Sequence, residues 1–185
     1  MEIKHILGEI CDELSRTFDT MDEEQLDELE RRVLAANRVF VAAAGRSLLA
    51  IRAFAMRLMH FGFDVYVVGE TVTPAIQPGD LLIIASGSGS TSTLVAVAQR
   101  CKQAGADLAL ITTRPESPIG ELADHIVYLE AFTSKLPDSG IKSVQLGGNT
   151  FEQGVLLIGD AIIIDIAGSS PEKNAELMTR HANLE

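Results

Sequence analysis

Hydroxyl side chains are concentrated in one short stretch near the middle of the chain. Residues 86–93 read SGSGSTST and stand between an aliphatic run, residues 81–85, and an amphipathic segment that begins at Leu94. A loop that leaves a parallel strand and opens a helix presents backbone N–H groups and the positive end of the helix dipole. Glycines let a ligand approach the backbone closely, and Ser and Thr add neutral donors that rotate to fit. The stretch therefore predicts an anion site, with phosphate as its commonest ligand.

The familiar nucleotide and hydrolase motifs do not account for this stretch. The chain has no GxxxxGK[ST] sequence for a nucleotide P-loop and no GxSxG sequence for a nucleophilic serine. The dinucleotide fingerprint GxGxxG also fails, because Ser92 stands where the third glycine belongs. Two interpretations remain, an ordinary capped turn and a phosphate site. Six hydroxyls exceed what a helix cap requires, which favours the phosphate site.

A second loop of the same kind adds a permanent positive charge. Residues 44–47 read AGRS and follow an apolar run at residues 38–44. In doubly wound sheets, ligands bind beyond the carboxyl ends of the strands where the strand order reverses. If the first and third strands are neighbours, both loops flank one crevice, and Arg46 would bind a phosphate or a sugar hydroxyl there. The alternative is a surface arginine that pairs with an acid.

The spacing of apolar residues supplies the elements that must position these loops. Continuous apolar runs predict buried parallel strands, and runs at helical spacing between them predict an α/β domain. An N-terminal helical hairpin precedes the first strand, and two irregular connections, residues 69–80 and 132–149, are long enough to suggest function. The expected strands are 38–44, 63–68, 81–85, 108–112 and 125–129, and the later expected helices are 51–62, 94–104, a short one at 118–123 and a long apolar one at 151–167.

Composition and charge restrict the classes of partner. The 185 residues suit one domain, and their formal charge of −11 disfavours nucleic acid and anionic membranes as partners. No apolar run reaches the roughly 18 residues that span a bilayer, and the N-terminus lacks a signal-peptide pattern, so we expect a cytoplasmic protein. Cys11 and Cys101 have no metal-binding spacing, and Cys101 lies on an apolar helical stripe, which predicts a buried thiol.

Several short motifs together resemble a known family. AGRS, RLMHFGF, GETVTP, SGSGST, FEQ and the terminal HANLE resemble the 6-phospho-3-hexuloisomerases of the sugar isomerase (SIS) domain family. The resemblance implies a single SIS domain over residues 1–185, with a five-stranded parallel sheet in flavodoxin-like order. Residues 1–36 would form helices packed on or between subunits, and residues 37–185 the α/β core and the C-terminal tail.

The resemblance also implies an activity. It implies interconversion of D-arabino-hex-3-ulose 6-phosphate and fructose 6-phosphate through a 2,3-enediolate, in the ribulose monophosphate pathway of formaldehyde fixation. It further implies a homotetramer with sites at subunit boundaries, functional coupling to hexulose-phosphate synthase, and no metal or organic cofactor. Two alternatives stay open: another SIS isomerase, acting on arabinose 5-phosphate or heptose 7-phosphate, and a sugar-phosphate sensor without catalysis.

The family's site residues are carried over by position. A carboxylate near two adjacent sugar carbons can take a proton from one and return it to the other, and the resemblance assigns this role to Glu152, although the helix dipole alone also favours a glutamate in a first turn. The phosphate-binding positions carried over, together with the glycines and arginine of the same loops, are Gly45, Arg46, Ser47, Ser86, Gly87, Ser88 and Thr91.

Three further residues are candidates for the site, and each also has an explanation that involves no function. His181, in the terminal HANLE, would move the hydroxyl proton in its own subunit or a neighbouring one, unless it is a solvated tail residue. His60, at the end of a helix, would face the crevice, unless the helix dipole alone explains it. Glu70, after the second strand, would bind substrate hydroxyls, unless it is an ordinary loop acid.

Overall fold

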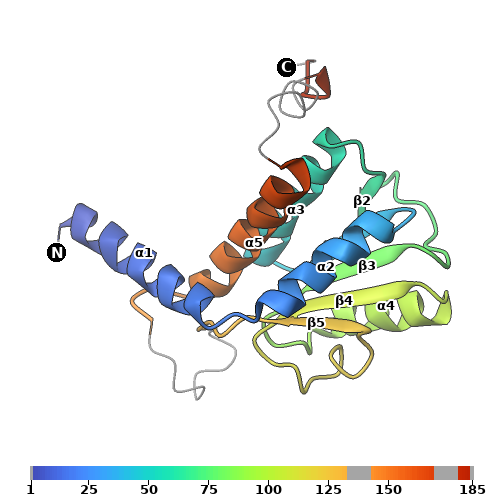
Figure 1. The fold of residues 1–185 in the computed structure, drawn as a ribbon. Helices are drawn as coiled ribbons and strands as arrows, with labels where there is room; N and C mark the ends of the chain where they lie inside the picture. The colour runs from blue at the N-terminus through green and yellow to red at the C-terminus, as the bar shows by residue number, and fades with distance from the viewer. Residues whose placement is uncertain (1, 133–142, 169–178, 184–185) are drawn as a thin grey trace.

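A five-stranded parallel sheet forms the centre of the molecule (Figure 1). The computed structural model describes residues 2–132, 143–168 and 179–183. The strand order is β2-β1-β3-β4-β5 and every neighbouring pair is parallel, which confirms the expected flavodoxin-like order. The order reverses between β1 and β3, so the loops after these two strands lie side by side. The strands are β1 (Val39–Ala43), β2 (Val65–Val67), β3 (Leu81–Ala85), β4 (Asp107–Thr112) and β5 (His125–Tyr128).

Helices cover both faces of the sheet. Alternate residues of a strand point to opposite faces, so Val39 and Val41 of β1 pack into one core and Phe40 and Ala42 into the other. The first core lies under α2, α3 and α5, and the second lies under α4. Cys101 of α4 is 1% exposed, which confirms the buried thiol. The helices are α1 (Ile3–Asp19), α2 (Glu23–Ala35), α3 (Arg46–His60), α4 (Ser92–Gln103) and α5 (Asn149–Ala167).

Close packing of α3 against α5 aligns the two helices that carry the candidate charged groups. A Cβ atom added to Gly159 would lie only 2.8 Å from the Cβ atom of Phe54, so the absent side chain lets the two helices approach. Figure 1 shows them side by side, and both begin at the same end of the molecule. This packing brings the first turns of α3 and α5 together.

Two expected elements differ from the structure. The N-terminal helices are present, but they do not form a hairpin: α1 points away from the sheet (Figure 1), and its C-terminal half packs on α5 rather than along α2. The expected short helix at residues 118–123 is absent, and residues 118–122 form consecutive turns instead. The irregular connection 132–149 falls partly outside the described residues. In the described part of the chain, no helix has the length and apolar character required to cross a bilayer.

Candidate active site

A cleft of about 280 Å³ opens where β1 and β3 end. Its wall is formed by the loop after β1, the loop after β3 and the pair Gly147 and Gly148 before α5. The helices that follow these segments, α3, α4 and α5, therefore all begin at the cleft. The structure therefore brings together the two loops that the sequence predicted to be neighbours. The residues of these loops that line the cleft include Gly45, Arg46, Ser47, Ser86, Gly87, Ser88 and Thr91, and the third wall adds Gly147, Gly148, Phe151 and Glu152.

The loop of residues 86–91, called the hydroxyl loop from here on, is held against β4. The carbonyl of Gly87 accepts hydrogen bonds from the hydroxyls of Thr113 at 2.7 Å and Thr112 at 3.2 Å. Ser86 and Ser88 are buried in the protein, yet both line the cleft. The hydrogen bonds that hold the Gly87 backbone therefore also fix the positions of these two hydroxyls at the cleft.

The starts of the three helices suit an anion. Within the described residues, no side chain forms a capping hydrogen bond at the N-terminus of α3, α4 or α5. Gly45 and Gly148 occupy two of the N-cap positions with φ of 62° and 92°, a conformation that glycine adopts without strain. Three helix dipoles thus direct positive ends into one cleft, which favours a phosphate there without any lysine.

Glu152 and Arg46 meet at the same cleft. The Nε–H group of Arg46 donates to the Glu152 carboxylate, in an ion pair between the first turns of α3 and α5. The Glu152 side chain is 11% exposed and the Arg46 side chain 67% exposed, so protein encloses most of the acid while most of the arginine faces solvent. Arg46 does pair with an acid, as the plain alternative predicted, but that acid is the candidate base.

Glu70 does not reach this cleft. It forms an exposed ion pair with Arg52 at 2.7 Å, beside β2. Because its carboxylate is engaged outside the cleft, the structure does not bring Glu70 to the position expected for binding substrate hydroxyls.

The two candidate histidines lie together but away from Glu152 of the same chain. His60 ends α3, so it lies about 21 Å along the helix axis from Arg46 at its start. The ring of His181 stacks on that of His60, with centroids 5.1 Å apart. His60 is buried and its Nδ1 atom has no hydrogen-bond partner among the described residues. Burial, then the neighbouring His181 and Arg57, lower the pKa of His60.

The glycine pair before α5 was not predicted as part of the site. Gly147 and Gly148 have φ values of 72° and 92°, and together with Phe151 they form the third wall of the cleft. A sequence signal exists, since GGNT precedes a long apolar helix as the AGRS and SGSGST loops precede theirs.

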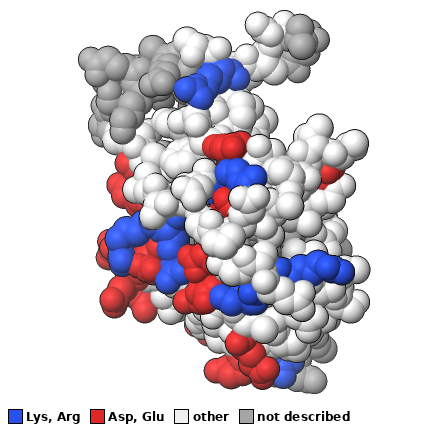
Figure 2. Space-filling view, turned by 90° about the vertical axis from the view of Figure 1, so that its right-hand side faces the viewer, with Lys and Arg blue, Asp and Glu red and all other residues white. Residues whose placement is uncertain are grey.

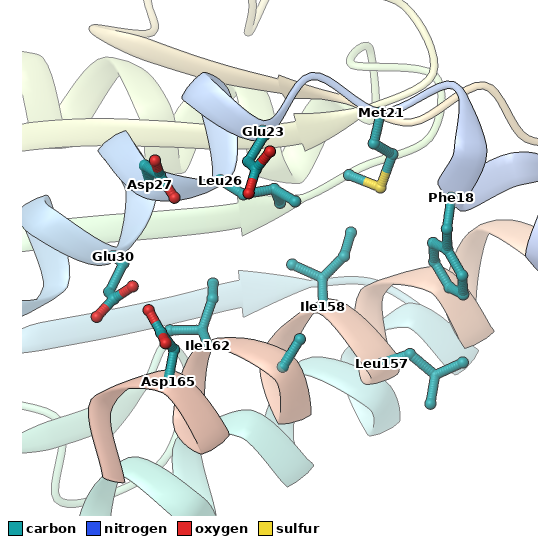
Figure 3. Close-up of a pocket in the computed structure, with 11 residues that line it drawn as sticks. Phe18, Met21, Glu23, Leu26, Asp27, Glu30, Leu157, Ile158, Ile162 and Asp165 are labelled. Atoms are coloured by element: carbon teal, nitrogen blue, oxygen red, sulfur yellow. The ribbon is translucent and has the colours of Figure 1, made fainter. Parts of the chain in front are cut away.

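A larger cavity, of about 430 Å³, lies elsewhere and has a different character (Figure 3). It separates α2 from α5 and has an apolar lining that includes Leu26 and Ile162. The carboxyl groups of Glu30 and Asp165 lie close together at one end of it (Figure 3), and burial, followed by the hydrogen bond with Asp165, raises the pKa of Glu30. Its described lining residues include acids and no base, so it does not suit an anionic substrate.

Several basic side chains elsewhere on the surface form ion pairs with acidic ones. Figure 2 shows Lys and Arg side chains scattered or beside acidic ones, with no continuous basic surface on that face. In the described part of the chain, no group of three or more His, Cys, Asp or Glu side chains is arranged to hold a metal ion. The basic residues in the principal ion pairs are Arg32, Arg38, Arg52 and Lys102.

Comparisons with known proteins agree with this geometry. The SIS domain family matches residues 33–141. The chain is 45% identical to a 3-hexulose-6-phosphate isomerase from Mycobacterium gastri, covering 100% of this chain and 92% of that protein. It is 38% identical to one from Bacillus subtilis, with 100% of both chains covered. It also resembles the crystal structure of a Methanococcus jannaschii protein for which a molecular function of 3-hexulose-6-phosphate isomerase was inferred, with a TM-score of 0.80, 35% identity, and 98% and 99% coverage.

Proposed function

The chain belongs to the SIS domain family and, within it, to the 3-hexulose-6-phosphate isomerases, and from this premise we propose that it interconverts D-arabino-hex-3-ulose 6-phosphate and fructose 6-phosphate. One observation carries the chemistry: a single cleft joins three helix N-termini and a hydroxyl loop to the carboxylate of Glu152. Uncharged donors for a phosphate and a base for a sugar carbon therefore lie in one cavity.

The phosphate is bound at the hydroxyl loop. Ser47, Ser86, Ser88 and Thr91 contribute hydroxyls to the cleft, and the starts of α3 and α4 contribute N–H dipoles. Binding at C6 fixes C2 and C3 against Glu152, so binding energy from a group that does not react is used for orientation. Local neutral donors also explain how a chain with a charge of −11 attracts an anion.

Glu152 moves the proton between the two carbons. Its carboxylate removes the C2 proton, and the electron pair forms a C2–C3 double bond while the C3 carbonyl becomes an enediolate oxygen. The hydroxyl proton passes from O2 to O3, the C2 carbonyl forms, and protonated Glu152 returns its proton to C3. C2 is oxidised to a carbonyl while C3 is reduced to an alcohol, and the carboxylate ends as it began, so the reaction needs no external oxidant.

Arg46 stabilises the charge that develops on the sugar oxygens. In the structure its Nε–H group is directed at Glu152, which is where the reacting carbons would lie. A guanidinium group presents several donors in a rigid plane, and donors aimed at a developing oxyanion lower the barrier. We assign Arg46 to the enediolate rather than to the phosphate.

The remaining candidates require more than one subunit. His60 and His181 are stacked at the far end of α3, so they act in catalysis only if a second subunit brings them to a Glu152 cleft. A homotetramer, with residues 1–36 packed on or between subunits, is supported by the unpacked end of α1, where Ile3 and Leu7 are 78% and 56% exposed. We retain Glu70 as a substrate contact only on the same condition.

The setting of the reaction follows from its substrate. A 3-hexulose 6-phosphate must be supplied by a condensation such as that of hexulose-phosphate synthase, which joins formaldehyde to ribulose 5-phosphate. We therefore propose a cytoplasmic role in the ribulose monophosphate pathway of formaldehyde fixation, with no metal or organic cofactor required for the proton transfers described.

A coupled assay tests the proposal. The purified protein is added to hexulose-phosphate synthase, formaldehyde and ribulose 5-phosphate, and fructose 6-phosphate formation is measured. We expect Glu152→Gln to lower kcat by at least about 100-fold, the usual contribution of a general base, and to change KM little. A kcat within about tenfold of the original, roughly 1.4 kcal/mol in barrier, would exclude Glu152 as the base.

The control and the substrate panel separate the alternatives. Glu24 also stands in a first helical turn, but on the exposed side of α2, so Glu24→Gln removes an equivalent charge from a helix dipole without affecting kcat. Turnover of arabinose 5-phosphate or heptose 7-phosphate alone would indicate a different SIS isomerase. Binding of fructose 6-phosphate without any turnover would indicate a sensor.

A further inference from the structure

One buried acid has no role in the chemistry described above. Glu13 lies on α1, which packs on α5, and it is only 7% exposed. A buried carboxylate is unfavourable unless it is hydrogen-bonded or paired. The buried Asp80 pairs with Arg38, whereas Glu13 accepts its hydrogen bonds from neutral groups.

The donors to Glu13 come from both sides of the glycine pair. The hydroxyl of Ser143 donates at 2.6 Å and the backbone N–H of Val144 donates at 3.1 Å. The third donor is the hydroxyl of Thr150, in the first turn of α5. Burial alone would raise the pKa of Glu13, but these hydrogen bonds, with the charge of Arg16, hold that pKa below its ordinary value. The carboxylate is therefore ionised at neutral pH, with its donors in place.

A neighbouring amide extends the same connection. The Nε2–H group of Gln145 donates to Gln153 of α5 at 2.9 Å, and the N–H of Gln145 donates to the Ser143 hydroxyl at 2.9 Å. Residues 143–145 are thus joined to α1 on one side and to the first turns of α5 on the other.

The segment held in this way forms the third wall of the cleft. Gly147 and Gly148 lie between the two groups of donors, and both have φ values in the left-handed region. Glycine allows many other conformations, so contacts on both sides are needed to select this one. Thr150 is 1% exposed and precedes Glu152 by two residues, so its position sets where α5 begins and where the Glu152 side chain lies.

We propose that Glu13 is a positioning residue for Glu152, acting through Ser143, Val144 and Thr150 on the glycine turn that opens α5. The inference rests on the proposed function, in which Glu152 is the base. The hydroxyl loop, which binds the phosphate, is held by contacts at the end of β4 and not by α1, so loss of Glu13 disturbs the base and leaves phosphate binding almost unchanged.

The kinetic test is Glu13→Gln in the full-length protein. We expect kcat for the hexulose phosphate to fall about tenfold or more, because moving a catalytic group by about 1 Å or less has a large effect on the rate. KM should stay within about threefold of the original value. Glu9→Gln makes the same change on the same helix at a less buried position, and it leaves both constants unchanged. A Glu13→Gln variant with unaltered kcat, or with kcat retained and KM raised, would overturn the proposal.

A second pair of variants covers the case in which Glu13→Gln does not fold. Thr150→Ser keeps the hydroxyl that donates to Glu13, and Thr150→Val removes it at nearly constant volume. We expect Thr150→Ser to keep most of kcat and Thr150→Val to lose most of it, measured where both variants are fully folded. Equal losses in the two variants would assign the network to packing alone and overturn the proposal.

A measurement without substrate separates the two proposals. Hydrogen exchange at the Val144 amide is expected to accelerate in Glu13→Gln and not in Glu9→Gln, because the carboxylate is its acceptor. If the unmodified protein shows no isomerase activity, the proposed function fails while the exchange still decides whether Glu13 orders the turn. If activity is present and exchange is unaltered, only the positioning role fails.

Discussion

Replacing Gly89 by alanine tests whether the hydroxyl loop depends on one close contact. Gly89 has a φ of 57°, which costs an L-residue roughly 1–2 kcal/mol. An added Cβ atom would overlap the Ser117 hydroxyl and lie 2.5 Å from the Ser117 Cβ atom. Ser117 is buried and its hydroxyl accepts from the Gly120 N–H at 3.2 Å, so it cannot move without breaking that bond. Such overpacking costs about 1–3 kcal/mol, and the free energy of unfolding should fall by about 2–5 kcal/mol.

Urea unfolding and the isomerase assay measure the two consequences. Because displacement of Gly89 shifts the neighbouring Ser88, KM should rise together with the loss of stability. In Gly89→Ala/Ser117→Gly the overlap is removed and only the φ cost remains, so stability should return to within about 1–2 kcal/mol of Ser117→Gly. Gly8→Ala, on the exposed side of α1 with no atom within 4 Å, should be neutral or stabilising by up to about 1 kcal/mol. A loss below about 0.5 kcal/mol for Gly89→Ala, with unchanged KM, would refute the reasoning.

Two other measurements address the phosphate site and the histidine pair. Ser88→Ala should raise KM by about tenfold to a hundredfold, since hydrogen bonds to charged groups contribute roughly 1.5–3 kcal/mol. Ser90 is exposed and lies outside the cleft, so Ser90→Ala should leave KM unchanged. Equal effects of the two substitutions on KM would argue against the phosphate site. Lowering the pH through about 6.5, the ordinary pKa of histidine, should reduce the melting temperature, because the lowered pKa of His60 means that the unfolded chain takes up a proton that the folded chain does not. His60→Phe keeps a ring against His181 and should flatten this dependence; an unchanged slope would show that other groups cause it.

Much of the fold was predictable because the relevant signals are local. A buried parallel strand requires a continuous apolar run, and residues 81–85 form β3 with the expected bounds. The hydroxyl loop was also recognisable, since glycines, hydroxyls and a helix start act within a few residues of one another. The expected hairpin failed for the converse reason: apolar spacing shows which residues of α1 share a face, but not which element that face contacts.

The alternation of strands and helices and the chemistry of each loop could be inferred from the amino-acid sequence, because both depend on residues that are neighbours along the chain. Which loops share a cleft became clear only from the packing of the folded chain. Arg46 and Glu152 are 106 residues apart, and they meet because α3 and α5 pack closely at Gly159 with their first turns together. The same packing places His60 a helix length away, and the fold of α1 onto α5 makes Glu13 a buried acceptor. In each case the position depends on the direction and packing of whole helices, which no local pattern encodes.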